Sequence, residues 1–328
     1  MAVVPEEMTC LLKEKENEGY TLLTRPVPVP GPADVIIKVD RVSICGSDIN
    51  LWKWNDVARV IATVPFIPGH EATGEVVAVG SGVTEVKLGQ RVAVENHYYC
   101  GTCYQCKEGR GDICQRLSQY GHGRGTDQGG CCQYSCVPAR FCYVWRTMQW
   151  RISVWLGRTC WCWAVDLWDW AREVYGVDVD PERLSLALQM GATEVINGAK
   201  ENITSVVMNL SNKNGVGRIV EASGAASLLN QSFSWLRKGG QMVLIGLPKE
   251  PLHVENVLTD VVFKSLTLKT VHGRRIFHTW EECERLLADG LVNVGPVVSH
   301  RLPMTQYLHA FNLLMTGAAC KIILDPQH

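Results

Sequence analysis

The sequence predicts an α/β chain with two domains, one mostly β and one built on a doubly wound parallel sheet. A chain of 328 residues, 46% of them hydrophobic, is long enough to bury two cores. From Val35 to Val94, short β-type runs alternate with Gly and Pro turns, which is typical of a compact β domain. From Glu173 onward, strand patterns alternate with helix patterns, which predicts parallel βαβ units.

The individual elements follow from these patterns. In the first part, the runs VIIKVD, GEVVAVG and RVAVEN are expected to be strands. In the second part, Pro181 favours a helix start, because proline suits the first helical turn. The expected elements there are strands at 173–180, 193–197, 217–224 and 241–247 and helices at 181–192 and 227–240. After Thr270 we expect a helix at 279–290 and a strand at 320–325 that returns to the first domain.

Composition excludes several classes of protein. With 32 basic and 33 acidic residues, the chain has no charge excess to attract nucleic acid or an anionic membrane. We find no stretch long enough to span a bilayer and no secretory or transit signal near the start, so a cytoplasmic location is expected. The chain has 14 cysteines, six of them between Cys100 and Cys132, and this clustering favours metal ligation over disulfides.

Four cysteines in one loop have the spacing of a structural zinc site. Cys100, Cys103, Cys106 and Cys114 form C-x2-C-x2-C-x7-C on a polar, glycine-containing stretch. Four thiolates give zinc a closed tetrahedral site that holds a loop and leaves no position for chemistry. The alternatives are unrelated free cysteines, or a nucleic-acid-binding zinc loop, which its few basic residues disfavour.

Cys45 and His70 follow β-type runs, where their side chains can converge with Glu71. A lone Cys or His is more often packed than ligating, but the three together supply the soft, borderline and hard ligands of a zinc with an open position. Such a zinc lowers the proton affinity of a bound alcohol, so that hydride can leave the carbon.

The motifs CGSD, GHEATGEVVAVGSGV, GQRVAVENHYYCGTCYQC, GVDVDPERLSLALQMGATEVIN and LRKGGQMVLIGLP occur here in the order of a known family. The chain resembles the zinc-dependent medium-chain dehydrogenase/reductase family. LWKWNDVA, the pair Glu95 and His97, and GRRIFHTW resemble its L-threonine 3-dehydrogenase branch, with sorbitol- or butanediol-type polyol dehydrogenases as alternatives.

The resemblance implies a GroES-like catalytic domain, at 1–145 and 272–328, split around a Rossmann NAD-binding domain at 146–271. It implies NAD(P)-dependent oxidation of a secondary alcohol, in this branch L-threonine to 2-amino-3-oxobutanoate. It also implies a homo-oligomer, a tetramer or a dimer.

Site residues are carried over from the family by position. Cys45, His70 and Glu71 correspond to catalytic-zinc ligands, and Ser47 to the hydroxyl that accepts the proton of the substrate alcohol. Asp48 corresponds to a carboxylate that orients a ligand, and His97 to a histidine of the substrate pocket. The family's histidine at position 50 is replaced by Asn50, which cannot relay a proton as imidazole does, so we expect an impaired relay.

The cofactor expected is NAD rather than NADP. Asp178 closes the strand EVYGVD, where an acid accepts hydrogen bonds from the adenosine ribose and repels a 2′-phosphate. The alternative is that Asp178 only starts a turn before Pro181. The cofactor-binding residues expected besides Asp178 are Arg183, Ser223, Gly224 and Gly246.

The phosphate-binding loop of a Rossmann domain is missing from the sequence. Between Gly130 and Gly176 the chain has one glycine, Gly157, whereas seven of the 11 tryptophans lie between Trp145 and Trp170. Indole side chains cannot replace glycines where the backbone must approach a phosphate closely. Reading the codons of 160–170 one base earlier permits VLVLGCGPVGL, a strand followed by a glycine loop.

We therefore infer that 146–170 is a frame-shifted segment, with some coding sequence deleted. The further glutamate ligand that the family carries in this region is also missing, since no glutamate lies between Glu108 and Glu173. Two hypotheses follow. The chain is a dehydrogenase whose sequence is altered by a gene-model or splicing artefact, or it is a true variant that retains zinc but has lost NAD binding. In either case, without the first strand the middle domain is expected to fold marginally.

Overall fold

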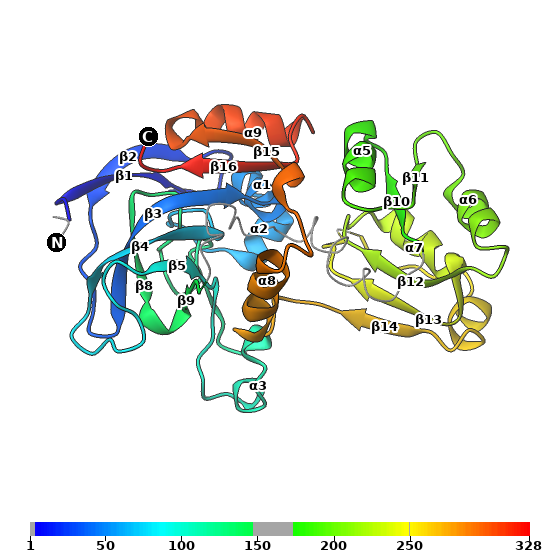
Figure 1. Cartoon of the computed structure of the whole chain (residues 1–328), viewed down its shortest axis with the longest axis horizontal. Coiled ribbons are helices and arrows are strands. Elements are labelled where there is room, and N and C mark those ends of the chain that lie inside the picture. The colour runs from blue at the N-terminus through cyan, green and yellow to red at the C-terminus, as the bar shows by residue number, and fades with distance from the viewer. Residues whose placement is uncertain (1–3, 147–172, 249) are drawn as a thin grey trace. The chain divides into compact units, whose positions relative to one another are not determined.

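The computed structural model describes residues 4–146, 173–248 and 250–328. These residues form two compact units (Figure 1). The first unit comprises 4–146 and 273–328, and the second comprises 173–248 and 250–272. Apart from Arg146, the segment expected to be frame-shifted lies outside the described residues.

The first unit is built on a seven-stranded sheet with the order β15-β16-β3-β4-β5-β9, in which β8 also pairs with β3. Buried and partly buried side chains alternate along β8 and most of β4. The long β3 has neighbours on both edges, and most of its side chains are buried. A separate hairpin is formed by β1 and β2. The strands are β1 (Glu7–Leu12), β2 (Thr21–Pro26), β3 (Asp34–Ile44), β4 (Ala72–Val79), β5 (Arg91–Val94), β6 (His97–Tyr98), β7 (Ser118–Gln119), β8 (Tyr134–Pro138), β9 (Cys142–Val144), β15 (Val298–Pro303) and β16 (Lys321–Asp325).

Short helices connect the strands of the first unit. Asn55 begins α2 by accepting hydrogen bonds from the backbone N–H groups of Val57 and Ala58, the usual stabilisation of a helix N-terminus. On the return segment, β16 pairs with β3, so the terminal strand lies in the sheet of the first unit. The helices are α1 (Gly46–Lys53), α2 (Asp56–Ile61), α3 (Tyr104–Lys107), η1 (Gly111–Ile113), η2 (Ala139–Phe141), α8 (His278–Ala288), η5 (Gly295–Val297), η6 (Met304–Gln306) and α9 (Tyr307–Met315).

The second unit alternates parallel strands with helices, as the sequence predicts. Asp180 caps α5 by accepting from the Glu182 N–H, and Pro181 occupies the first turn. Its elements are β10 (Tyr175–Asp178), α5 (Pro181–Gln189), β11 (Glu194–Asn197), α6 (Ile203–Leu210), β12 (Val216–Glu221), α7 (Ala226–Trp235), β13 (Leu236–Leu244), η4 (Leu258–Val262) and β14 (Thr267–Thr270).

The parallel strands of this unit form two separate sets. β10 pairs with β11, and β13 pairs with β12 and β14. Within the part of the chain that the structure describes, no pairing joins β10 to β12. In a doubly wound sheet of order 3-2-1-4-5-6, the first strand lies between the second and the fourth. Here that position falls between β10 and β12, and the expected first strand lies outside the described residues.

The largest differences from the expected limits lie at α7 and at β13, which was expected at 241–247. The helix expected at 227–240 ends at Trp235, and Leu236 already belongs to β13. Two adjacent glycines, Gly239 and Gly240, are poor helix formers. Parallel pairing of Val216 with Leu236 places this segment in the sheet. None of the helices in the described ranges has the length and apolar character that crossing a bilayer requires.

Candidate active site

The first candidate residues lie where β3 ends and α1 begins. Cys45 occupies the N-cap position of α1, with extended backbone angles. Asp48, in the first turn, accepts a hydrogen bond from the Cys45 N–H through Oδ2 at 2.8 Å, which stabilises the helix start. The Ser47 hydroxyl lies 3.5 Å from Cys45 Sγ. One short turn therefore presents a thiol, a hydroxyl and a carboxylate together.

His70 and Glu71 reach the same place from the loop before β4. Gly69 has a φ of +87°, a left-handed conformation that glycine adopts without steric cost, so the chain turns sharply before His70. The Ser47 hydroxyl lies 3.2 Å from His70 Nε2. The ligand atoms of Cys45, His70 and Glu71 all lie within 4.8 Å of one another. The structure thus brings together the three residues that the sequence analysis grouped.

Asp48 and His70 form a buried pair beside this group, with 3.3 Å between Asp48 Oδ1 and His70 Nδ1. Burial opposes a charge on His70, but the Asp48 carboxylate raises the pKa of His70 well above its usual value. Burial likewise opposes a charge on Asp48, and the neighbouring His70 lowers the pKa of Asp48 below its usual value. The pair orients the imidazole, so that Nδ1 faces Asp48 and Nε2 faces the Cys45 side.

Glu71 has one carboxylate oxygen paired and the other unpaired. Its Oε2 accepts hydrogen bonds from the Ser43 hydroxyl and from Lys321 Nζ. Its Oε1 is buried and has no hydrogen-bond partner among the residues that the structure describes. Since a buried carboxylate oxygen normally has a partner, this oxygen marks a place for a cation. Thiolate, imidazole and carboxylate are ligands of catalytic zinc, so the donor set fits that ion.

The four-cysteine loop around α3 and η1 also fits zinc. The Sγ atoms of Cys103 and Cys106 are 3.4 Å apart, those of Cys103 and Cys114 3.8 Å, and those of Cys100 and Cys106 3.9 Å. Tetrahedral thiolates about 2.3 Å from zinc are about 3.8 Å from one another. Hydrogen bonds from Thr102 and the Cys103 N–H lower the pKa of Cys100 to about 5, which favours the ligating thiolate.

In the second unit, the structure places Asp178 and Arg183 together at the carboxyl end of β10. Asp178 Oδ1 accepts from the backbone N–H groups of Val179 at 2.7 Å and Asp180 at 3.0 Å. Arg183 Nη1 lies 3.9 Å from Asp178 Oδ2. Asp178 therefore does shape the turn, as one interpretation of the sequence held. Its role at a ribose stays a prediction.

Ser223, Gly224 and Gly246 also lie together, around Glu221 at the carboxyl end of β12. Glu221 Oε1 accepts from the Ser223 N–H at 2.8 Å, the Ser223 hydroxyl at 2.6 Å and the Gly224 N–H at 2.8 Å. The Gly246 N–H donates to the Glu221 carbonyl at 2.9 Å. A Cβ on Gly246 would lie 2.5 Å from the Gly224 nitrogen, so this approach requires glycine.

His97 lies in a different buried group of the first unit. Its N–H donates to Glu95 Oε1 at 2.8 Å, and a Cβ on Gly273 would lie 2.6 Å from its ring. Among the described residues, the group of possible metal ligands that contains Cys45 does not include His97. A role for His97 toward substrate therefore stays a prediction.

Sequence reasoning missed three buried polar residues of these groups. Lys321 pairs with Glu71, and its signal was a lysine at the head of the apolar run IILD. Glu221 organises the loop after β12, and its signal was an acid inside the strand expected at 217–224. His122 packs on His70, and a lone histidine in the stretch YGHG gave no signal.

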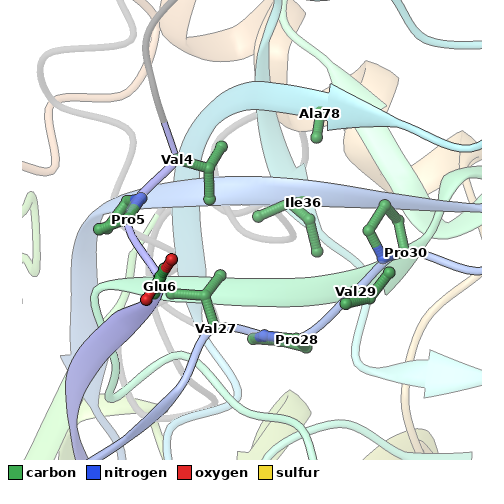
Figure 2. A pocket seen from close by; sticks show the side chains of 9 residues that line it. All are labelled: Val4, Pro5, Glu6, Val27, Pro28, Val29, Pro30, Ile36 and Ala78. Carbon is green, nitrogen blue, oxygen red and sulfur yellow. The ribbon is translucent and has the colours of Figure 1, made fainter.

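A shallow apolar hollow on the first unit carries no comparable chemistry (Figure 2). Of the described residues that line it, only Glu6 is charged. Four of the other eight belong to the segment Val27–Pro30. None of the predicted site residues lines the hollow, so the groups of polar side chains described above remain the candidates for function.

Comparison with known proteins agrees with this geometry. Residues 31–147 match the alcohol dehydrogenase GroES-like domain, and residues 168–289 match the zinc-binding dehydrogenase domain. An L-threonine 3-dehydrogenase of Bacillus licheniformis is 32% identical over 97% of this chain and 99% of its own length. That of Legionella pneumophila is 32% identical over 97% of this chain and 100% of its own length. The alcohol dehydrogenase of Thermus sp. ATN1 has a TM-score of 0.83 at 24% identity, over 97% of this chain and 99% of that one.

The chain belongs to the zinc-binding medium-chain dehydrogenases, and it is an oxidoreductase by family. Within that family, its curated relatives place it in the L-threonine 3-dehydrogenase branch. These findings confirm the resemblance and the fold class predicted from the sequence. The alignment with the Bacillus relative spans 349 positions, whereas the chain has 328 residues, so that relative carries residues that this chain lacks.

Proposed function

We propose that the chain is a zinc- and NAD-dependent dehydrogenase that oxidises L-threonine to 2-amino-3-oxobutanoate. The observation that supports it most is the unpartnered buried Oε1 of Glu71 beside Cys45 and His70, which matches a zinc site with an open position. The name of the curated relatives supports threonine as the substrate. A polyol of the sorbitol or butanediol type is the alternative substrate.

The residues of the first unit have distinct roles in this proposal. Cys45, His70 and Glu71 hold the zinc, which when bound polarises the substrate hydroxyl. Ser47, whose oxygen is 3.2 Å from His70 Nε2, accepts the proton that leaves the alcohol. Asp48 holds the His70 ring through Nδ1. The four cysteines of the loop hold a structural zinc. Because the Asn50 amide cannot accept a proton and pass it on, the proton of the alcohol reaches solvent more slowly than it would through a histidine at this position.

The second unit supplies the dinucleotide site in this proposal. Asp178, with Arg183 beside it, faces the adenosine ribose and favours NAD over NADP. Ser223, Gly224 and Gly246 line the carboxyl edge of the sheet, the edge where open α/β sheets bind ligands. Domain limits at 145 and 271, a homo-oligomeric state and a cytoplasmic location belong to the same proposal.

A second candidate function is a zinc-binding variant that has lost NAD binding. The sequence favours it, because Gly157 is the only glycine between Gly130 and Gly176, where the phosphate loop is expected. The greater length of the alignment with the Bacillus relative is in keeping with a deletion.

Three measurements on the purified chain test these functions. Metal analysis should find two zinc ions per chain, and Cys45→Ser should lose one of them. Titration with NADH, followed by nicotinamide fluorescence, separates the enzyme from the variant, since saturable binding eliminates the variant. NADH production from L-threonine, compared with sorbitol and butanediol, selects the substrate. A chain that binds one zinc before and after Cys45→Ser contradicts the catalytic-zinc proposal. Sequencing the transcript across codons 140–175 decides whether a glycine loop is encoded in frame.

A further inference from the structure

Two loops of the first unit interlock beside the proposed zinc site. Gly121 has a φ of +77°, and a Cβ there would lie 2.7 Å from the carbonyl carbon and oxygen of Gly69. A Cβ on Gly123 would lie 1.9 Å from the Thr63 oxygen. Real Cβ atoms do not approach backbone so closely, so glycines at 121 and 123 let the loop that carries His122 lie directly against the loop that carries His70.

His122, between these two glycines, is held from several sides. Its N–H donates to the Gln119 carbonyl at 3.3 Å, and its carbonyl accepts from the Thr63 N–H at 3.0 Å. Its ring Nδ1 lies 3.1 Å from the Tyr120 carbonyl oxygen, and the side chain is buried. Since a carbonyl oxygen only accepts, Nδ1 carries a proton and donates. These contacts fix the direction of the His122 ring.

The fixed ring of His122 contacts the ring of His70. The two centroids are 4.7 Å apart and the ring planes are tilted by 47°. His70 is therefore restrained twice, through Nδ1 by Asp48 and over its ring by His122. The described group of possible metal ligands holds Cys45, His70 and Glu71 without His122, so His122 acts on a ligand and is not itself one.

We propose that His122 is a positioning residue of the catalytic zinc site. Its ring limits rotation of His70, so that Nε2 stays directed toward the zinc position beside Cys45 and Glu71. This inference rests on the proposed function, since it requires zinc at that site. Residues that contact and orient a metal ligand without binding the metal typically raise metal affinity about 10- to 100-fold. We expect His122 to contribute an effect of this size.

The test is cobalt titration of the full chain, read by the visible absorption of bound Co²⁺. Cys45→Ser identifies the signal of the cysteine loop alone. His122→Ala should weaken cobalt binding at the Cys45 site about 10- to 100-fold and shift its absorption bands, while the cysteine-loop signal stays unchanged. His309→Ala is the matched control, since His309 is an exposed histidine of the same unit, on α9, and should change neither site.

His122→Asn adds a second comparison, because a shorter amide can keep an N–H donor for the Tyr120 carbonyl while losing the ring that covers His70. It should also weaken the Cys45 site, and it serves as the test variant if His122→Ala does not fold. Affinity and absorption bands equal to those of the unaltered chain, in a folded His122 variant, would overturn the inference. A chain that binds no more cobalt than Cys45→Ser would instead refute the proposed function.

Discussion

The buried ion pair between Arg274 and Glu95 gives the sharpest stability prediction. Arg274 Nη2 lies 3.3 Å from Glu95 Oε1, and the two side chains are 7% and 0% exposed. Glu95 also accepts from Trp280 Nε1 at 2.8 Å, so it ties the return segment to β5. Arg274→Met removes the cation and leaves the carboxylate buried without its counter-charge. We expect the first unit to lose several kcal/mol of unfolding free energy.

The magnitude follows from the geometry. Two unit charges 3.3 Å apart interact by about 5 kcal/mol at an effective dielectric constant of about 20. Removing one partner of a buried pair costs about 3–5 kcal/mol in measured cases. For a unit of this size, such a loss lowers the melting temperature by on the order of 10 °C. Scanning calorimetry of the variant measures the shift.

Two further variants make the test specific. Arg285→Met removes an exposed pair with Glu282 in the same unit, with side chains 53% and 48% exposed, and should cost less than about 1 kcal/mol. Arg274→Met combined with Glu95→Gln removes both charges and should recover much of the loss. If Arg274→Met costs no more than Arg285→Met, buried charge pairing does not stabilise this unit.

Three other predictions test separate parts of the first unit. Lys13→Met should lower stability by about 3 kcal/mol in thermal denaturation, because the buried Lys13 Nζ donates to three backbone carbonyls. After zinc is chelated, an alkylating reagent near neutral pH should modify Cys100 and spare Cys10, whose pKa burial raises to about 11, as peptide mapping will show. Gly121→Ala should cost more in a urea titration than Gly89→Ala, which pays only the left-handed strain of about 1–2 kcal/mol because no atom lies within 4 Å of its Cβ.

Much of the fold could be predicted because local pattern and tertiary structure agree. The alternation of strand and helix after Glu173 is a local signal, and the helix starting at Pro181 formed where its cap and proline place it. The end of α7 was wrong because Leu236 is apolar and continues the helical pattern, while its true partner is Val216 in β12. Pairing between distant strands outweighs local propensity at such a boundary.

In the candidate site, only the residues that stand in short sequence motifs could be predicted. Cys45, His70 and Glu71 stand in short motifs, and the structure brings them together. Lys321 reaches Glu71 because Ile322 pairs with Ile44, at the end of β3. That register joins segments from opposite ends of the chain, and no local pattern specifies it. His122 was missed for the same reason, since its ring contacts His70 only because two loops distant in sequence lie against each other.

The final prediction concerns the expected first strand of the second unit. We expect both the stability of this unit and its NAD binding to depend on that strand. Val177 of β10 and Val216 of β12 pack in one apolar cluster, although no pairing joins these strands in the described ranges. Asp178 ends β10 and Glu221 ends β12, so both halves of the proposed dinucleotide site lie at strands that would flank the expected first strand.

A chimera tests this dependence. Residues 147–172 are replaced by a strand, a G-x-G-x-x-G loop and a helix of the general Rossmann pattern, and the control chimera carries a Gly→Trp change in that loop. Because one strand would both pair with β10 and β12 and present the loop to the diphosphate, the chimera should gain saturable NADH binding and a higher melting temperature together. The control should gain stability with little NADH binding. A chimera that binds NADH without any rise in stability would show that sheet continuity and cofactor binding are independent.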